Sequence, residues 1–245
     1  MAKKYDLIGY KQYRYNDDIV INIPTIGQIR NENDKESENR FWKEANLFIK
    51  TPSDMISELD SLGIDFETIS EYVLFIMLIT SYIADENNSF QLFDGLDFRK
   101  LKMQANDSGE LIFVDKSGRE IFNKIIYLDV SDIITAMIGT EKTPKKKFGN
   151  EFAKKMRIKQ DYKKKEKARK EQDNNDSVLS SIILRLVNNA NFPYDFSTIK
   201  NVTIYDVFQS VKQIDKEISV NEIMDSRLVG ADLNKLPKEA LSRYV

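Results

Sequence analysis

The sequence of 245 residues contains no cysteine and no histidine. Without cysteine there is no disulfide, no thiolate metal site and no cysteine nucleophile. Without histidine the chain lacks the commonest general base and the commonest transition-metal ligand, so Ser-His-Asp and Cys-His triads are excluded. The missing cysteines also suit a reducing cytosol, although cysteine-free proteins occur in every compartment.

Long hydrophobic runs are absent as well. The most apolar stretch, residues 72–79 (YVLFIMLI), is far shorter than the roughly 20 residues of a membrane-spanning helix. The basic N-terminus (MAKKYDLIGYKQYRY) is not followed by an apolar core of signal-peptide length. We therefore expect a buried helix at 72–79, no membrane association and no export.

The formal net charge of −2 hides an uneven distribution of charge. Residues 1–141 hold 15 basic and 25 acidic side chains, residues 142–171 hold 14 and 4, and residues 172–245 hold 8 and 10. This pattern predicts an acidic mixed domain at 1–141, a basic linker at 142–175 that is helical or disordered, and a small all-α domain at 176–245. The fold class that we expect is α+β.

In the acidic part, the apolar periodicity alternates between the strand value of two and the helix value of 3.6. The predicted elements, in order, are a β-hairpin at 10–23, a helix at 41–48, a helical hairpin at 51–83, a three-stranded β-meander at 98–122 and a helix at 125–137. Thr51 and Asp54 form a capping box at the start of the helical hairpin. Gly63 suits the end of its first helix, and Asp65 or Thr68 is predicted to cap the second.

The basic linker is rich in good helix formers, but only its first half offers apolar anchors, at Phe152 and Met156. We expect the second half to be a solvated helix or disordered. In the tail, amphipathic helices are predicted at 178–187 and 204–218, with shorter helical pieces at 222–228 and 237–242. Two capped helices with matching apolar faces predict that the tail folds without the first 140 residues.

The cations of the linker are candidates for an electrostatic contact. They are Lys145, Lys146, Lys147, Lys154, Lys155, Lys163, Lys164, Lys165, Lys167, Arg169 and Lys170. A solvated linker helix, an electrostatic protein contact and a nucleic-acid contact are all open at this stage. Nucleic acid is the weaker alternative, because aromatic residues are few in the linker and no recognition motif is present.

Aromatic residues of the acidic part are candidates for a partner-binding groove. They are Phe41, Trp42, Phe48, Tyr72 and Tyr82. The ordinary alternative is that these side chains form the core, and a groove would receive an amphipathic helix of a partner.

Carboxylates of the predicted meander are the only hint of catalysis. They are Asp94, Asp97, Glu110, Asp115 and Glu120, with lysines nearby, as a magnesium-dependent nuclease would require. Their spacing fits no catalytic signature, and no glycine-rich phosphate loop is present. We therefore expect no enzyme, no catalytic residue, no metal site and no cofactor.

Four segments of the chain resemble, in the same order, segments of a family of proteins from tailed bacteriophages of Gram-positive hosts. They are YKQYRYNDDIVINIPTIGQI, TPSDMISELDSLGIDFETISEYVLFIMLI, LFDGLDFRKLKMQ and NVTIYDVFQSVKQI. The resemblance covers both predicted folded parts and the basic linker. It implies a non-enzymatic tail assembly chaperone or a related tail-morphogenesis protein, and it carries no catalytic motif.

Such a chaperone is expected to bind the long tape-measure protein, to assist the tail tube, to self-associate and to act in the bacterial host cytoplasm during phage assembly. A tape-measure protein is a long helical chain whose apolar stripes aggregate unless they are covered. A structural tail or baseplate protein of the virion and a nucleic-acid-binding protein are the alternatives.

Overall fold

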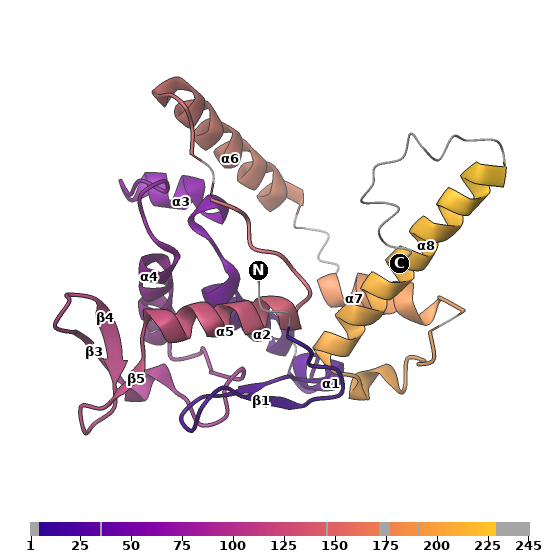
Figure 1. Ribbon diagram of the computed structural model, residues 1–245, viewed down its shortest axis with the longest axis horizontal. Helices are drawn as coiled ribbons and strands as arrows, with labels where there is room; N and C mark the ends of the chain where they lie inside the picture. The colour runs from indigo at the N-terminus through magenta and orange to yellow at the C-terminus, as the bar shows by residue number, and fades with distance from the viewer. Residues whose placement is uncertain (1–4, 35, 146, 172–176, 191, 229–245) are drawn as a thin grey trace.

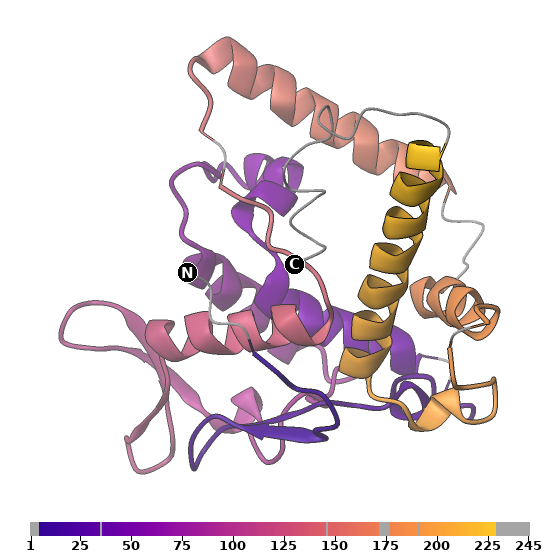
Figure 2. The same ribbon diagram turned by 45° about the vertical axis from the view of Figure 1, so that its right-hand side comes forward.

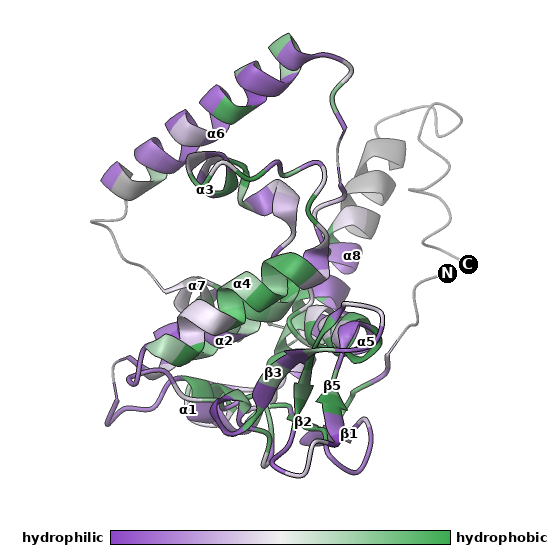
Figure 3. Ribbon diagram, turned by 90° about the vertical axis from the view of Figure 1, so that its left-hand side faces the viewer, coloured by the Kyte–Doolittle hydropathy of each residue, from purple (hydrophilic) through white to green (hydrophobic). Residues whose placement is uncertain are grey.

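The computed structural model describes residues 5–34, 36–145, 147–171, 177–190 and 192–228 (Figure 1). Within these residues the chain forms helices and two small antiparallel sheets, so the predicted α+β class is confirmed. Figure 3 shows that helix α4 (Glu71–Ala84) is mostly hydrophobic, whereas helix α6 (Glu151–Glu171) is mostly hydrophilic.

The chain begins with the predicted β-hairpin. Strands β1 (Gln12–Arg14) and β2 (Val20–Asn22) pair antiparallel, with Tyr13 opposite Ile21. Two helices follow, α1 (Ile26–Ile29) and α2 (Ser37–Ile49).

The two helices predicted at 51–83 are present, but the first packs mainly on the later helix α6 (Glu151–Glu171) and not on the second. Their caps also differ from the prediction in two places. The Thr51–Asp54 capping box opens a 3-10 turn, η1 (Pro52–Asp54), and not the helix α3 (Ile56–Ser61) that follows it. The second helix, α4 (Glu71–Ala84), is capped by Ser70. The predicted caps Asp65 and Thr68 lie earlier, in the turn that separates the two helices, where Thr68 N–H donates to the Asp65 carbonyl at 3.1 Å.

The predicted meander is confirmed as a three-stranded antiparallel sheet. A 3-10 turn, η2 (Phe98–Lys100), leads into β3 (Lys102–Ala105), β4 (Leu111–Val114) and β5 (Glu120–Phe122). Helix α5 (Lys124–Met137) follows, and the chain leaves it through Gly139, whose φ is 65°.

The last elements are helices. They are α6 (Glu151–Glu171), α7 (Val178–Val187), the 3-10 turn η3 (Ile199–Asn201) and α8 (Ile204–Leu228). The two predicted pieces at 204–218 and 222–228 are in fact one continuous helix. The predicted piece at 237–242 lies outside the described residues.

The main core brings both ends of the chain together. Its centre is aromatic: Phe75 lies 5.6 Å from Phe122 and 4.8 Å from Tyr127 between ring centroids. The same hydrophobic cluster contains Leu179 of α7 and Val207 of α8. Figure 2 shows α8 rising from the side of the body that carries α1 and α2.

Backbone hydrogen bonds join the tail to the first part of the chain. Ile26 N–H donates to the Val202 carbonyl and Ile204 N–H donates to the Pro24 carbonyl, both at 2.9 Å. The described part of the tail therefore buries its apolar face on the body as well as between its own helices. The division into three segments, with boundaries at 141/142 and 175/176, stays a prediction.

Candidate interaction surface on the basic arm

Residues 142–171, here called the basic arm, are fastened to the body from their first residue. Lys142 Nζ lies 3.4 Å from Glu71 and 3.1 Å from Asp132. The hydroxyl of Thr143 donates to Asp54 at 2.6 Å. Thus the body's own acidic side chains hold the start of the arm in place.

A second attachment lies at the start of α6, over the turn between α3 and α4. Lys154 Nζ lies 2.7 Å from Asp65 and 3.5 Å from Glu67, and 5.5 Å from the centre of the Phe66 ring. The Phe148 ring packs edge-on against Phe66, with centroids 6.1 Å apart. This attachment combines two ion pairs with the burial of aromatic surface.

The third attachment joins the middle of α6 to the first turn of α3. Asp161 accepts from the backbone N–H of Ser57 at 3.1 Å and from its hydroxyl at 2.7 Å. The side chain of Met55, the N-cap residue of α3, accepts no hydrogen bond from the first turn. Asp161, which lies on a different helix, accepts the free N–H of Ser57 in its place. Lys165 pairs with Asp161 at 2.8 Å and also with Glu58.

These contacts favour the ionised carboxylates. Burial raises the pKa of Asp161, but the hydrogen bonds from Lys165 and Ser57 outweigh burial and leave the pKa below its usual range. Burial also raises the pKa of Glu58, but the hydrogen bond from Lys165 outweighs burial, and the pKa of Glu58 is lowered. The hydrogen bond from Lys154 lowers the pKa of Asp65. These carboxylates are therefore ionised at neutral pH, and their ion pairs weaken when acid protonates them.

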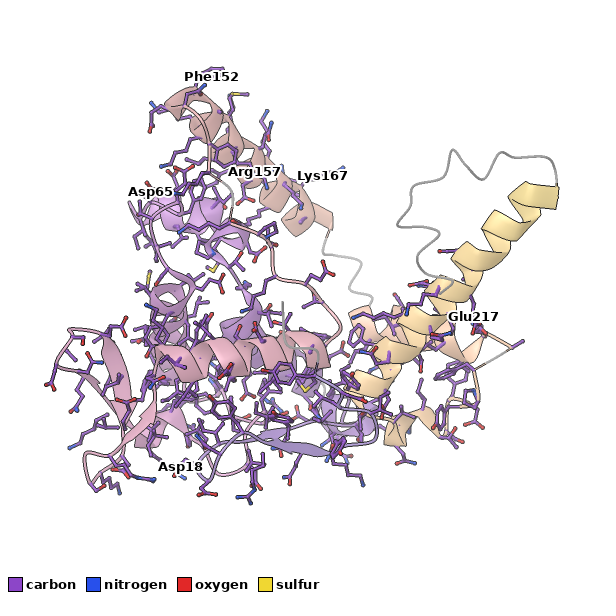
Figure 4. All side chains as sticks on the ribbon, viewed as in Figure 1. Asp18, Asp65, Phe152, Arg157, Lys167 and Glu217 are labelled. Atoms are coloured by element: carbon purple, nitrogen blue, oxygen red, sulfur yellow. The ribbon has the colours of Figure 1, made fainter. Side chains whose placement is uncertain are left out.

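The described residues leave the opposite face of α6 uncovered. Phe152 and Met156 are 74% and 42% exposed, and Figure 4 shows Phe152 at the outer end of α6, directed away from the body. Beside them a shallow groove of about 400 Å³ runs along the helix. Its lining comprises Asp60 of α3 and Lys155, Ile158, Lys159, Tyr162, Lys163 and Glu166 of α6.

The predicted cations thus divide into two groups. Lys154 and Lys165 are attachment residues, half-buried against the body, and so they are not the solvated charges that the sequence pattern indicates. Lys145 donates to the Ile69 carbonyl at 3.3 Å. The others with described side chains are exposed: Lys147, Lys155, Lys163, Lys164, Lys167 and Lys170. Lys146 and the side chain of Arg169 lie outside the described residues.

The predicted aromatic groove is wrong for four of its five residues. Phe41, Phe48, Tyr72 and Tyr82 are at most 6% exposed and belong to the main hydrophobic cluster. Only Trp42 is half-buried, with its ring 5.0 Å from Phe41. These rings belong to the core because they lie on the faces of α2 and α4 that pack against the rest of the main hydrophobic cluster.

Two of the meander carboxylates that suggested a nuclease serve turns instead, and Glu110 pairs with Lys124 of α5 at 3.0 Å. Asp97 pairs with Arg99 at 2.9 Å, and Asp115 with Arg119 at 3.4 Å. Among the described residues, no group of three or more Asp or Glu side chains is placed to hold a metal ion.

Sequence reasoning missed Ser57, Asp161 and Lys159. One signal was available: Asp161 is an acidic residue in a strongly basic helix, at a spacing of four from Lys165. Its partner Ser57 is 104 positions away, and no local pattern points to it.

Comparisons with protein-family models, with curated proteins and with solved structures find no match for this chain. No helix among the described residues combines the length and the hydrophobicity needed to cross a membrane.

Proposed function

We propose that this protein is a non-enzymatic bacteriophage tail assembly protein, a chaperone that binds the tape-measure protein and assists assembly of the tail tube in the host cytoplasm. The sequence resemblance to phage tail proteins gives this role its specific content. The observation that carries the proposal is that α6 is fixed to the body along one face and, in the part of the chain that the structure describes, uncovered along the other.

A fixed helix with a free face is suited to bind another helix. Because Asp161 and Lys154 already hold α6, binding does not have to order it, and less conformational entropy is lost on association. The exposed Phe152 and Met156 supply apolar surface that a partner helix can bury. A tape-measure protein, as a long helical chain, presents such helices repeatedly.

Co-expression with the tape-measure protein encoded in the same phage genome tests the proposal. We expect an affinity tag on this protein to retain the tape-measure protein and keep it soluble. We also expect mass spectrometry of purified virions to lack this protein, since a chaperone leaves the finished tail. A stoichiometric amount in the virion would instead make it a structural tail or baseplate protein, and failure to form any complex would contradict the proposal.

A further inference from the structure

The groove on α6 is the space between two neighbouring ridges of the helix. The lysine row consists of Lys155, Lys159 and Lys163, and the inner row consists of Ile158, Tyr162 and Glu166. Each row follows the spacing of four residues that forms a ridge on a helix surface. A helix of another molecule packs by laying its own ridge into such a groove.

The lysine row carries charge that no described residue neutralises. Among the described residues, Lys155, Lys159 and Lys163 have neither a hydrogen bond nor an ion pair, in contrast to Lys154 and Lys165 on the attached face. Successive lysines of the row are about 6 Å apart along the helix axis, since the rise is about 1.5 Å per residue. Acidic residues at every fourth position of a second helix repeat at the same distance.

The walls of the groove favour a helix over a nucleic acid. Ile158 and the Tyr162 ring give it an apolar side, and the Tyr162 hydroxyl is already used in a hydrogen bond to the Ser57 carbonyl at 3.0 Å. Asp60 and Glu166 place two carboxylates on its rim, which would repel a phosphate backbone. A protein helix can bury apolar side chains against Ile158 and place a cation beside Asp60.

We propose that the groove between the lysine row and the inner row binds an amphipathic helix of a partner protein, with Asp or Glu at every fourth position beside an apolar stripe. The acidic residues pair with the lysine row, and the apolar stripe covers Ile158 and the Tyr162 ring. This inference rests on the proposed function and narrows the partner class to acidic segments of a helical tail protein.

The test uses the full chain and a synthetic helical peptide of about 20 residues, with a leucine stripe flanked by Glu at every fourth position. Fluorescence anisotropy measures its binding to the wild type, to K155E/K159E/K163E and to the matched control K43E/K116E/K212E. The control replaces three exposed lysines outside the groove and changes the net charge equally. We expect the groove variant to bind at least about tenfold more weakly and the control to bind within about twofold of the wild type.

A second variant acts in the opposite direction. Asp60→Lys removes a carboxylate from the rim, and we expect it to tighten binding of the acidic peptide by a few-fold, whereas a fold defect would weaken it. Equal loss of binding in the groove variant and the control would overturn the inference. So would retention of single-stranded DNA or RNA by the lysine row in place of the peptide.

The two proposals fail in different ways. If K155E/K159E/K163E still retains the tape-measure protein as the wild type does, the groove inference is overturned and the proposed function stands. If the wild type binds the acidic peptide but no tape-measure protein, the groove inference is supported and the proposed function fails.

Discussion

Asp161 of α6 accepts two hydrogen bonds from Ser57 of α3, one from the backbone N–H at 3.1 Å and one from the hydroxyl at 2.7 Å. Asp161 is only 8% exposed, although it lies in the most basic segment of the chain. The pair therefore shows that the middle of the basic arm is part of the fold and not a solvated spacer.

Replacing Asp161 tests how much this pair contributes to arm attachment. Asp161→Ala removes the cap of α3 and one partner of Lys165, so we expect the local opening free energy of α6 to fall by about 1–2 kcal/mol. Hydrogen exchange of the α6 amides should become at least about fivefold faster. Glu166→Ala, on the exposed face, is the control and should leave exchange nearly unchanged. If both variants exchange like the wild type, the pair does not hold the arm.

Gly139 is a position where the fold requires glycine. Its φ is 65°, and a Cβ there would lie 2.7 Å from Cβ of Phe208 in α8. We expect Gly139→Ala to cost about 2–4 kcal/mol, because left-handed strain adds to a steric clash in the core. The matched control is Gly63→Ala, where φ is 71° and nothing lies within 4 Å, so that only about 1 kcal/mol is lost. Urea unfolding measures both, and equal losses would show that α8 does not pack closely on Gly139.

Glu44 makes the stability of the protein depend on pH. Few other side chains titrate in the same range, because the chain has no histidine. This carboxyl is fully buried and accepts from the backbone N–H groups of Gln91 at 2.7 Å and Leu92 at 3.1 Å. Burial raises its pKa from 4.5 to about 8, against the opposing effect of these hydrogen bonds. The folded protein thus holds one proton more than the unfolded chain between these two values.

The contribution of Glu44 to the free energy of unfolding should therefore be largest below about pH 5, fall by at most about 1.4 kcal/mol per pH unit up to about pH 8, and then level off. Glu44→Gln keeps an oxygen acceptor but cannot titrate, so its stability should vary less over this range. Urea unfolding of both proteins between about pH 5 and pH 8 is the measurement. Parallel curves would mean that Glu44 is already ionised when buried.

The tail should not fold alone, contrary to what its two amphipathic helices predict. Leu179 and Val207 are buried in the main cluster with residues of the body, and Ile204 N–H donates to the Pro24 carbonyl. Residues 177–245 without the body would expose this surface. We expect the isolated fragment to show no cooperative thermal transition by circular dichroism, whereas the full chain shows one. A cooperative transition of the fragment would restore the independent domain.

Local features of the fold were predictable because their signals are local. The hairpin, the meander, the Thr51–Asp54 capping box and the glycines that end helices all depend on residues within a few positions of one another. Even there, competition between neighbouring caps misled the prediction, since Ser70 and not Asp65 caps α4.

What was not predictable is which surfaces meet. An amphipathic helix shows that one face is buried but not against which element, so α7 and α8 were assigned to each other when they also pack on the body. For α6 the charge pattern did not show which face is attached to the body, because nothing in the sequence distinguishes Lys154 and Lys165 from their exposed neighbours. Only the body's acidic residues, brought close by the fold, separate the two groups.

Zero-length cross-linking tests the central claim, that the basic arm is docked on its own body, most directly. A carbodiimide joins an amine to a carboxylate only where the two are in direct contact, as Lys165 and Glu58 are, and as Lys154 and Asp65 are at 2.7 Å. The account predicts amide links between these residues in the monomer fraction, found by peptide mass spectrometry at neutral pH and low protein concentration. If the arm lysines instead form links only between molecules, or none with residues 54–67, the arm is not docked and the account is wrong.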